Sequence, residues 1–338
     1  MNAHSGPPLA LTMGEPGGIG PEITLAAWRT LRENGPVFFL LSDPALFANA
    51  GVAVKAIEKT GDALSVFNRA LPILDLKIPA RAKSGAADPA SAPAVIASIE
   101  RAVKLTLSGD AAGVVTNPIQ KSSLIGAGFN FPGHTEYLDA RAASAPMRAG
   151  RKRGAVMMIA GPDLKTVPVT IHQSVRDAAA SLTIEMIVEK ALIVADALKN
   201  DFGIDAPRLA ISGLNPHAGE SGHLGREEID IIAPAIDQLR KEGVAASGPH
   251  AADAMFHAAA RATYDAALCM LHDQALIPAK TLAFDEAVNV TLGLPFIRTS
   301  PDHGAALDIA GKGVARAGSL VAAINLAARM ASARRAAA

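Results

Sequence analysis

The sequence predicts an α/β fold made of two α/β/α domains. Short apolar runs of strand length alternate with amphipathic helical segments, and glycine or proline stands at the turns between them. The chain has 338 residues, which exceeds the length at which a single hydrophobic core stops growing. We therefore expect largely parallel sheets covered by helices, in more than one domain.

The first half of the chain sets this pattern. Residues 9–13 have the composition of a strand, and residues 17–20 form a glycine-rich turn. Pro21 suits the first position of a helix, so a helix is expected from there to about residue 32. The further elements expected in this half are a strand at 37–41, a helix at 92–107 and a buried strand at 113–116.

The second half continues the alternation. Its expected elements are strands at 154–160, 166–171, 208–211 and 266–271, and a long helix near 184–199. No linker marks a domain boundary, which indicates that the chain crosses between domains more than once. The expected division is residues 1–135 with 290–338 as the first domain and residues 136–289 as the second. The Ala/Arg-rich end after Met330 predicts a disordered tail.

Composition excludes several classes of protein. Thirty-two basic and 32 acidic residues give zero formal charge, so a general polyanion binder is not expected. Cys269 is the only cysteine, which excludes an internal disulfide framework and any multi-thiolate metal site. The start of the chain lacks the pattern of a signal peptide, and no apolar run has the length of a membrane span. A cytoplasmic location is expected.

Three histidines share one context. His172, His217 and His272 each follow a predicted strand at its carboxyl end, where ligands bind in open α/β sheets. Three imidazoles from three strands could meet on one divalent ion and leave coordination positions open for a substrate. For any single one, an ordinary polar residue in a loop is the favoured interpretation, and the shared placement of the three makes the two interpretations about even.

Two segments carry features that suit an anion. Residues 131–138, FPGHTEYL, place His134 and Thr135 at the start of a helix, where free N–H groups favour a phosphate or carboxylate. A plain N-cap role for Thr135 is the alternative. Downstream, Lys280, Asn289 and Arg298 interrupt an apolar segment, and a buried cation there is costly unless it meets an anion. A salt bridge to Asp302 or Asp285 would also explain Arg298.

The loop at 14–23, GEPGGIGPEI, is not a dinucleotide fingerprint. It lacks both the GxGxxG spacing and the acidic residue that binds a ribose. A tight turn from strand to helix, beside the active cleft, is the prediction for it.

Six segments together resemble the 4-hydroxythreonine-4-phosphate dehydrogenase family of pyridoxal phosphate biosynthesis. The likeness covers nearly the whole chain and rests on LTMGEPGGIGPEI, VVTNPIQK, FPGHTEYL, GLNPHAGESGHLGREEID, MLHDQALIPAK and VNVTLGLPFIRTSPDHGAALDIAGKG.

The resemblance implies a fold like that of isocitrate and isopropylmalate dehydrogenases, with an active cleft between two domains, and a homodimer with composite sites. It implies that His172, His217 and His272 bind one divalent metal (Zn, Mg or Co), with His272 supplied by the partner subunit. It assigns an acidic position near the metal to Asp253. It also assigns substrate binding to a further set of residues, namely His134, Thr135, Lys280, Asn289 and Arg298.

The segment at 303–313, HGAALDIAGKG, resembles the adenosine-binding loop HGSAPDIAGKG of the isopropylmalate dehydrogenases. Ala305 and Leu307 replace the Ser and Pro of that loop, which favours binding through the backbone. The resemblance therefore implies an NAD or NADP site at His303, Gly304 and Asp308, with Asp308 on the adenosine ribose.

The reaction that the resemblance implies is oxidation of 4-phosphooxy-L-threonine at its secondary hydroxyl, followed by decarboxylation to 3-amino-2-oxopropyl phosphate. A divalent ion would lower the pKa of that hydroxyl. Lys280 would supply or relay a proton, with Asp253 as the second catalytic candidate, although charge pairing with the substrate would explain Lys280 equally well. A phosphorylated four-carbon sugar acid and an aromatic cis-diol are alternative substrates within the family. A phosphate-metabolite binding protein without turnover is the alternative of another class.

Overall fold

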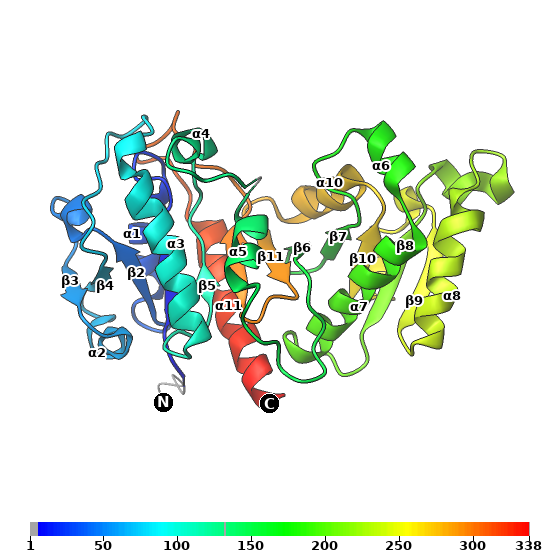
Figure 1. Ribbon diagram of the computed structural model, residues 1–338, viewed down its shortest axis with the longest axis horizontal. Helices are drawn as coiled ribbons and strands as arrows, with labels where there is room; N and C mark the ends of the chain where they lie inside the picture. Colours follow the sequence, from blue (N-terminus) through cyan, green and yellow to red (C-terminus); the bar gives the residue numbers. More distant parts are fainter. Residues whose placement is uncertain (1–5, 132, 338) are drawn as a thin grey trace. The chain divides into compact units, whose positions relative to one another are not determined.

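The computed structural model describes residues 6–131 and 133–337, so Pro132 of the predicted anion-binding segment lies outside the described residues. The chain divides into two compact units (Figure 1). Unit 1 comprises Met1–Pro146 and Leu294–Ala331, and unit 2 comprises Met147–Gly293 and Ser332–Ala338. The mixed α/β class expected from the sequence is confirmed, with helices and strands alternating along the chain.

Unit 1 contains a parallel sheet. Its strands lie in the order β3-β4-β2-β1-β5-β12, and each recorded pairing among them is parallel. The strands are β1 (Leu9–Thr12), β2 (Phe38–Ser42), β3 (Val54–Ile57), β4 (Leu71–Asp75), β5 (Val114–Val115) and β12 (Arg298–Pro301). Because parallel strands point the same way, their carboxyl ends meet at one edge of the sheet.

The helices of unit 1 cover this sheet, and α3 lies over β1 and β2. In the helix α1, which begins at Gly20, Pro21 lies in the first turn, one residue after the first position expected for it. Trp28 is buried, and its indole N–H donates to the Phe67 carbonyl at 2.8 Å. The helical segments are α1 (Gly20–Leu31), η1 (Pro44–Phe47), η2 (Thr60–Asp62), α2 (Ala63–Val66), η3 (Pro89–Ser91), α3 (Ala92–Leu107), α4 (Lys121–Ile125), α5 (His134–Ala142) and most of α11 (Gly318–Ala336).

Unit 2 contains a mixed sheet in the order β11-β6-β7-β10-β8-β9. Strands β7, β10, β8 and β9 are parallel neighbours, whereas β6 runs antiparallel to both β7 and β11. The strands are β6 (Val156–Ala160), β7 (Lys165–Pro168), β8 (Arg208–Ser212), β9 (Ala245–His250), β10 (Ala266–Cys269) and β11 (Val288–Leu292). The expected parallel arrangement therefore holds for only part of this sheet.

The helices of unit 2 pack on the same strands. Helix α7 begins where Thr183 caps it through the Met186 N–H, and acidic and basic residues at its two ends complement the helix dipole. The helical segments are α6 (Val175–Ser181), α7 (Ile184–Asn200), η4 (Pro216–Gly222), η5 (Glu228–Ile232, a π-helical turn), α8 (Ala233–Lys241), η6 (Ala252–Ala254), α9 (Ala258–Arg261) and α10 (His272–Ala283).

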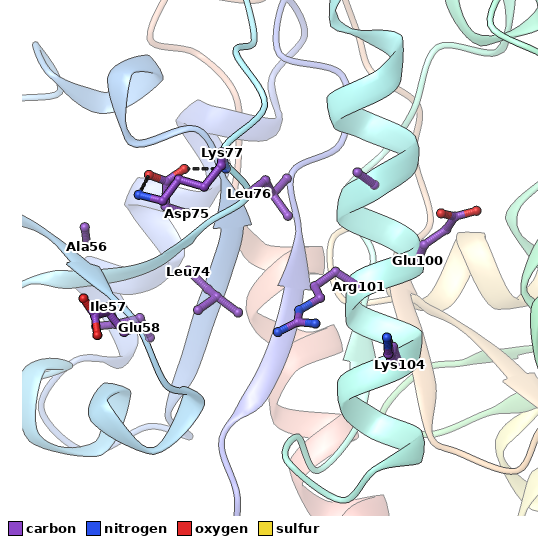
Figure 2. A pocket seen from close by; sticks show the side chains of 11 residues that line it. Ala56, Ile57, Glu58, Leu74, Asp75, Leu76, Lys77, Glu100, Arg101 and Lys104 are labelled. Atoms are coloured by element: carbon purple, nitrogen blue, oxygen red, sulfur yellow. Dashed lines mark hydrogen bonds and ion pairs between the residues drawn. The ribbon is translucent and has the colours of Figure 1, made fainter.

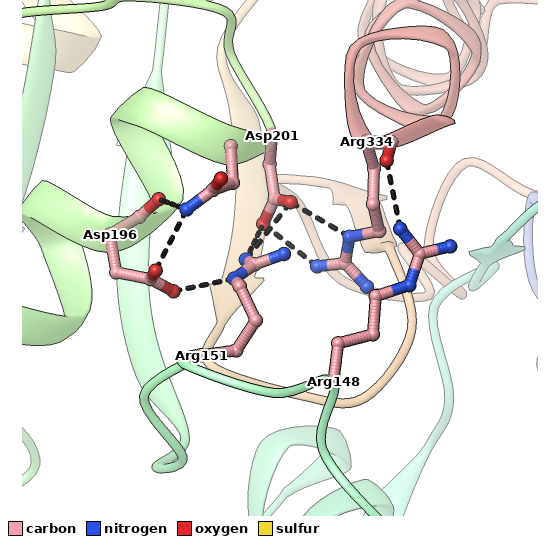
Figure 3. A network of polar contacts seen from close by, with 6 residues as sticks. Arg148, Arg151, Asp196, Asp201 and Arg334 are labelled. Carbon is pink, nitrogen blue, oxygen red and sulfur yellow. Dashed lines mark hydrogen bonds and ion pairs between the residues drawn. The ribbon is translucent and has the colours of Figure 1, made fainter. Parts of the chain in front are cut away.

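The prediction of a disordered tail after Met330 is wrong. Helix α11 continues to Ala336, and Arg334 in its last turn donates to both carboxylate oxygens of Asp201 at 2.7 Å (Figure 3). Asp201 also accepts from Arg151, which in turn pairs with Asp196 at 2.7 Å. Composition alone signalled low complexity, but this ion-pair network orders the end of the chain.

Cys269 is fully buried at the end of β10, and burial raises the pKa of its thiol well above the ordinary value. Within residues 6–131 and 133–337, no helix combines the length and the apolar character that a membrane crossing requires.

Candidate active site

The start of helix α5 in unit 1 carries the predicted anion-binding residues. Gly133 occupies the N-cap position, so Thr135 lies inside the helix and the alternative of a plain N-cap role is wrong. His134 is half-buried, and its Nε2 atom is buried with no hydrogen-bond partner in the described part of the chain. A buried imidazole nitrogen of this kind is costly unless it meets a ligand.

Two cations act on this imidazole. Burial, together with the charges of Arg298 and Lys121, lowers the pKa of His134 to about 3. Arg298 is 3% exposed and donates from Nη2 to the Thr116 hydroxyl at 2.8 Å. Burial lowers the pKa of Arg298 to about 10, while Glu136 opposes that shift, so the guanidinium is charged at neutral pH. The start of α5 therefore combines a neutral imidazole with positive charge, which suits an anion.

Lys121 was not among the residues that sequence reasoning assigned to this site. It begins α4, and a Cβ atom built on Gly133 would lie 4.0 Å from its ammonium nitrogen. The sequence feature that could have indicated Lys121 is the segment VVTNPIQK, in which the lysine follows a buried strand and the turn after it. The structure thus adds a second cation to the start of α5.

The predicted cofactor loop lies in unit 1 after β12. Asp308 is exposed, and a Cβ atom on Gly304 would meet nothing within 4 Å, so the backbone there is open to a ligand. The Nδ1 atom of His303 lies 3.1 Å from the Gly304 carbonyl, and its Nε2 atom is buried without a partner in the described chain. The Ile19 N–H binds the carbonyl of Ala305 at 2.9 Å.

The glycine-rich turn before α1 packs directly against this loop. A Cβ atom on Gly18 would lie 2.5 Å from the carbonyl oxygen of Ala305, so only glycine allows the approach. The Gly311 N–H also reaches the Glu22 carboxylate at 3.2 Å. The tight turn from strand to helix that the sequence predicted is confirmed, and its role here is to support the loop at 303–313.

The three candidate metal-binding histidines lie in unit 2 after neighbouring strands. His172, His217 and His272 follow β7, β8 and β10, and β10 pairs in parallel with the other two. The prediction that they occupy one edge of the sheet, beyond the carboxyl ends of the strands, is confirmed. Their role as metal ligands stays a prediction.

Two of these rings are close to each other. His172 and His272 have ring centroids 6.4 Å apart and line a hollow of about 210 Å³. The Nδ1 atom of His272 lies 2.8 Å from Asp273, and an N–H donated there leaves the Nε2 lone pair to face an ion. His172 has a positive φ of 51°, a strained conformation that is typical of functional positions.

His217 lies in a left-handed turn. In η4, His217, Ala218, Gly219, Glu220 and Ser221 all have φ between 43° and 78°, and each non-glycine residue in this region costs about 1–2 kcal/mol. No three His, Cys, Asp or Glu side chains gather as a ligand set within the described residues. One chain therefore brings together two of the three predicted ligands.

The other predicted residues of unit 2 lie on nearby elements. Asp253 is exposed on η6, which contacts η4. Lys280 is half-buried on α10, two turns after His272, and Asn289 is half-buried on β11. The predicted substrate-binding set is thus divided, with His134, Thr135 and Arg298 in unit 1 and Lys280 and Asn289 in unit 2.

A hollow of about 780 Å³ in unit 1 contains none of the predicted residues (Figure 2). It lies between β4 and α3, with an apolar floor that includes Leu74 and with Arg101 and Lys104 on its helical wall. Its charged side chains are mostly exposed and of mixed sign, and Lys77 already pairs with Asp75 at 2.8 Å. Size alone does not make this hollow the active site.

Ionisable side chains at the carboxyl ends of parallel strands are typical of α/β enzymes that act on small metabolites. Comparison with known proteins defines the enzyme further. The profile of the pyridoxal phosphate biosynthetic protein PdxA family matches residues 37–327. The chain belongs to this family, and it is an oxidoreductase.

A 4-hydroxythreonine-4-phosphate dehydrogenase of Bradyrhizobium diazoefficiens is 54% identical to the chain, over 99% of this chain and 100% of the relative. The crystal structure of the enzyme of that name from Klebsiella pneumoniae superposes with a TM-score of 0.85 at 33% identity, covering 97% of this chain and 99% of the other. A terephthalate 1,2-cis-dihydrodiol dehydrogenase from Burkholderia xenovorans is more distant, with a TM-score of 0.65 and 27% identity over 95% and 97% of the two chains.

Proposed function

We propose that the chain catalyses the NAD- or NADP-dependent, metal-dependent oxidation and decarboxylation of 4-phosphooxy-L-threonine to 3-amino-2-oxopropyl phosphate. The observation that carries this proposal is the cluster of an imidazole and two cations at the start of α5. There, His134 presents a buried nitrogen that has no partner among residues 6–131 and 133–337, under the positive potential of Arg298 and Lys121. A terminal phosphate dianion matches this cluster in charge and in hydrogen-bonding capacity.

The residues of unit 2 fit a divalent metal as far as one chain supplies them. His172 and His272 line a common hollow, and Asp273 orients the His272 ring in the manner of the carboxylates that support metal-binding imidazoles. A divalent ion, when bound, supplies a Lewis acid for the substrate hydroxyl. Asp253 would lie near the ion and Lys280 would donate a proton after the loss of carbon dioxide, while Asn289 would orient the substrate.

The loop at 303–313 fits a nicotinamide cofactor. Asp308 offers an exposed carboxylate to ribose hydroxyls. The open backbone at Gly304 and the Nε2 atom of His303, which has no partner in the described part of the chain, offer polar contacts. The cofactor, when bound, supplies the hydride acceptor. The isocitrate dehydrogenase-like arrangement of the two domains and a cytoplasmic location remain parts of the proposal.

The test compares substrates and variants in one assay of NADH formation. Wild type should oxidise the phosphorylated substrate far better than an unphosphorylated cis-diol, which is the substrate class named for the Burkholderia xenovorans relative. Arg298→Ala should lower kcat/KM for the phosphorylated substrate at least tenfold, since a hydrogen bond to a charged group contributes about 1.5–3 kcal/mol, and should affect the diol much less. Exposed Arg81→Ala is the matched control. Equal losses of kcat/KM on both substrates in Arg298→Ala would show that Arg298 does not bind the phosphate. Efficient turnover of the diol by the wild type would overturn the substrate assignment.

We also propose a homodimer with composite sites, because one chain brings together only two of the three histidines. Mixing inactive variants under conditions of subunit exchange identifies the shared ligand. A mixture of His172→Ala and His272→Ala regains activity if the partner subunit supplies His272. A mixture of His172→Ala and His217→Ala regains activity if the partner supplies His217. Verified heterodimers that stay inactive in both mixtures would refute a composite site.

A further inference from the structure

The left-handed turn that carries His217 requires a support outside itself. Four of its five left-handed residues have side chains, and an isolated peptide would leave this conformation for the right-handed region. Such strain persists only where surrounding contacts over-determine the backbone. The loop at 213–222 must therefore be held by neighbouring residues of unit 2.

The strongest of these contacts come from Glu228. This side chain is 3% exposed and belongs to the π-helical turn η5. Its Oε1 atom accepts from the backbone N–H groups of Leu214 at 2.8 Å and Asn215 at 2.7 Å, and Oε2 accepts from the side-chain amide of Asn215 at 3.0 Å. A Cβ atom on Gly219 would lie 2.5 Å from Oε2, so the turn closes directly onto the carboxylate.

A second contact ties the base of the same loop to the start of α10. The side chain of Gln274 donates to the Gly213 carbonyl at 3.1 Å and accepts from the Leu271 N–H at 3.0 Å. Leu271 immediately precedes His272. The base of the His217 loop is thus anchored to the sheet edge. The turn itself is held by Glu228, by Glu227, which accepts from the Asn215 amide at 2.7 Å, and by the Leu224 N–H, which donates to the Gly219 carbonyl at 3.1 Å.

We propose that Glu228 is a positioning residue for His217. Its carboxylate accepts hydrogen bonds from the backbone N–H groups that precede the turn, and these bonds hold the imidazole of His217 in one location. This inference rests on the proposed role of His217 as a metal ligand, and it holds whichever subunit completes the site. Partners that orient a ligand in this way typically change metal affinity 10–100-fold when they are removed.

The chemistry of these contacts predicts how strongly each variant should lower the metal affinity. Glu228→Ala removes every acceptor. Glu228→Gln keeps one oxygen for the two backbone N–H groups but places an amide NH₂ against the donating side chain of Asn215. Asp230→Asn is the matched control, because Asp230 lies on the same helical turn but is exposed and pairs only with Arg226 among its recorded contacts.

The experiment is titration of Co²⁺ alone into the metal-free, full-length protein, followed by calorimetry and by the visible spectrum of the ion. Co²⁺ affinity should fall about 10–100-fold in Glu228→Ala, less in Glu228→Gln, and not in Asp230→Asn. Circular dichroism checks that each variant is folded. In the background of His217→Ala, the further change Glu228→Ala should leave Co²⁺ affinity the same, because the two residues act through one contact with the ion.

The possible failures are distinguishable. Wild-type affinity in Glu228→Ala, with reduced affinity in His217→Ala, would overturn the positioning role and leave the proposed function intact. Wild-type affinity in His217→Ala would instead overturn the metal assignment itself. Additive losses in the double variant would show that Glu228 acts elsewhere and would also overturn the inference. Should Glu228→Ala fail to fold, Glu228→Gln and Gly219→Ala decide, and wild-type affinity in both would refute the proposal.

Discussion

Replacing Asp201 by Asn should destabilise unit 2 strongly. The Asp201 side chain is 1% exposed and accepts four N–H contacts, two from Arg151 at 2.9 and 3.0 Å and two from Arg334 at 2.7 Å (Figure 3). Both arginine side chains are themselves nearly buried, at 9% and 11% exposed. The substitution keeps the shape of the side chain and removes its charge.

The size of the effect follows from the burial of the partners. With Asp196, the network balances two cations by two anions, and the amide leaves one positive charge in excess. Removing one partner of a buried ion pair typically costs about 3–5 kcal/mol, because the remaining charge stays desolvated. An exposed pair is the contrast: Asp237→Asn breaks a contact to Arg240 between half-exposed side chains and should cost less than about 1 kcal/mol.

Urea denaturation followed by far-UV circular dichroism measures both variants. Trp28 is the only tryptophan and lies in unit 1, so its fluorescence separately reports that unit. We expect a lower midpoint for Asp201→Asn at an unchanged m-value, which indicates a change in stability rather than in the unfolded state. A loss below about 1 kcal/mol, equal to that of Asp237→Asn, would refute the reasoning from burial.

Three further predictions concern single groups. The folded pKa of His134, about 3, lies below its ordinary 6.5, so stability is full above pH 6.5 and falls as the pH drops toward 3. At pH 4.5 the wild type should have lost about 2–3 kcal/mol relative to His134→Gln, and parallel urea midpoints at pH 7 and 4.5 that do not diverge would count against this. Trp28→Phe should cost about 1–3 kcal/mol by leaving the buried Phe67 carbonyl unpaired, and an unchanged denaturation midpoint would contradict it. Ala218→Gly should be neutral or stabilising by up to about 1 kcal/mol, because it relieves a left-handed φ of 51°. The same change at buried Ala191 in α7 should destabilise, so thermal melts that rank the two variants the other way would disprove the strain argument.

Much of the fold could be predicted because apolar periodicity is local. The bounds expected for α3 were observed, and α7 begins at the expected residue. Strand β3 was not expected, since it is short and carries exposed side chains such as Lys55. The antiparallel direction of β6 was also not predictable, because the pattern of a strand does not encode the direction of its neighbours.

In the candidate site, too, the local features could be predicted from the sequence and the features that depend on distant contacts could not. The position of each histidine after a strand is a local property, and the sequence predicted it. The left-handed turn around His217 was hidden, because only Gly219 and Gly222 in that segment indicate an unusual backbone. Glu228 stands in the polar run GREEID, where a carboxylate is normally solvated, and its burial depends on a loop folded against it. Contacts between distant segments decide these features.

The buried Cys269 makes the chain a convenient host for site-specific labels. A thiol that is inaccessible and held in its protonated form reacts slowly with maleimides, since the thiolate is the nucleophile. The natural protein therefore offers little background to such reagents. A cysteine introduced at an exposed position, for example Glu220→Cys in the His217 turn, would be the dominant target. A fluorophore or spin probe placed there would follow the turn in solution without any need to remove the native cysteine first.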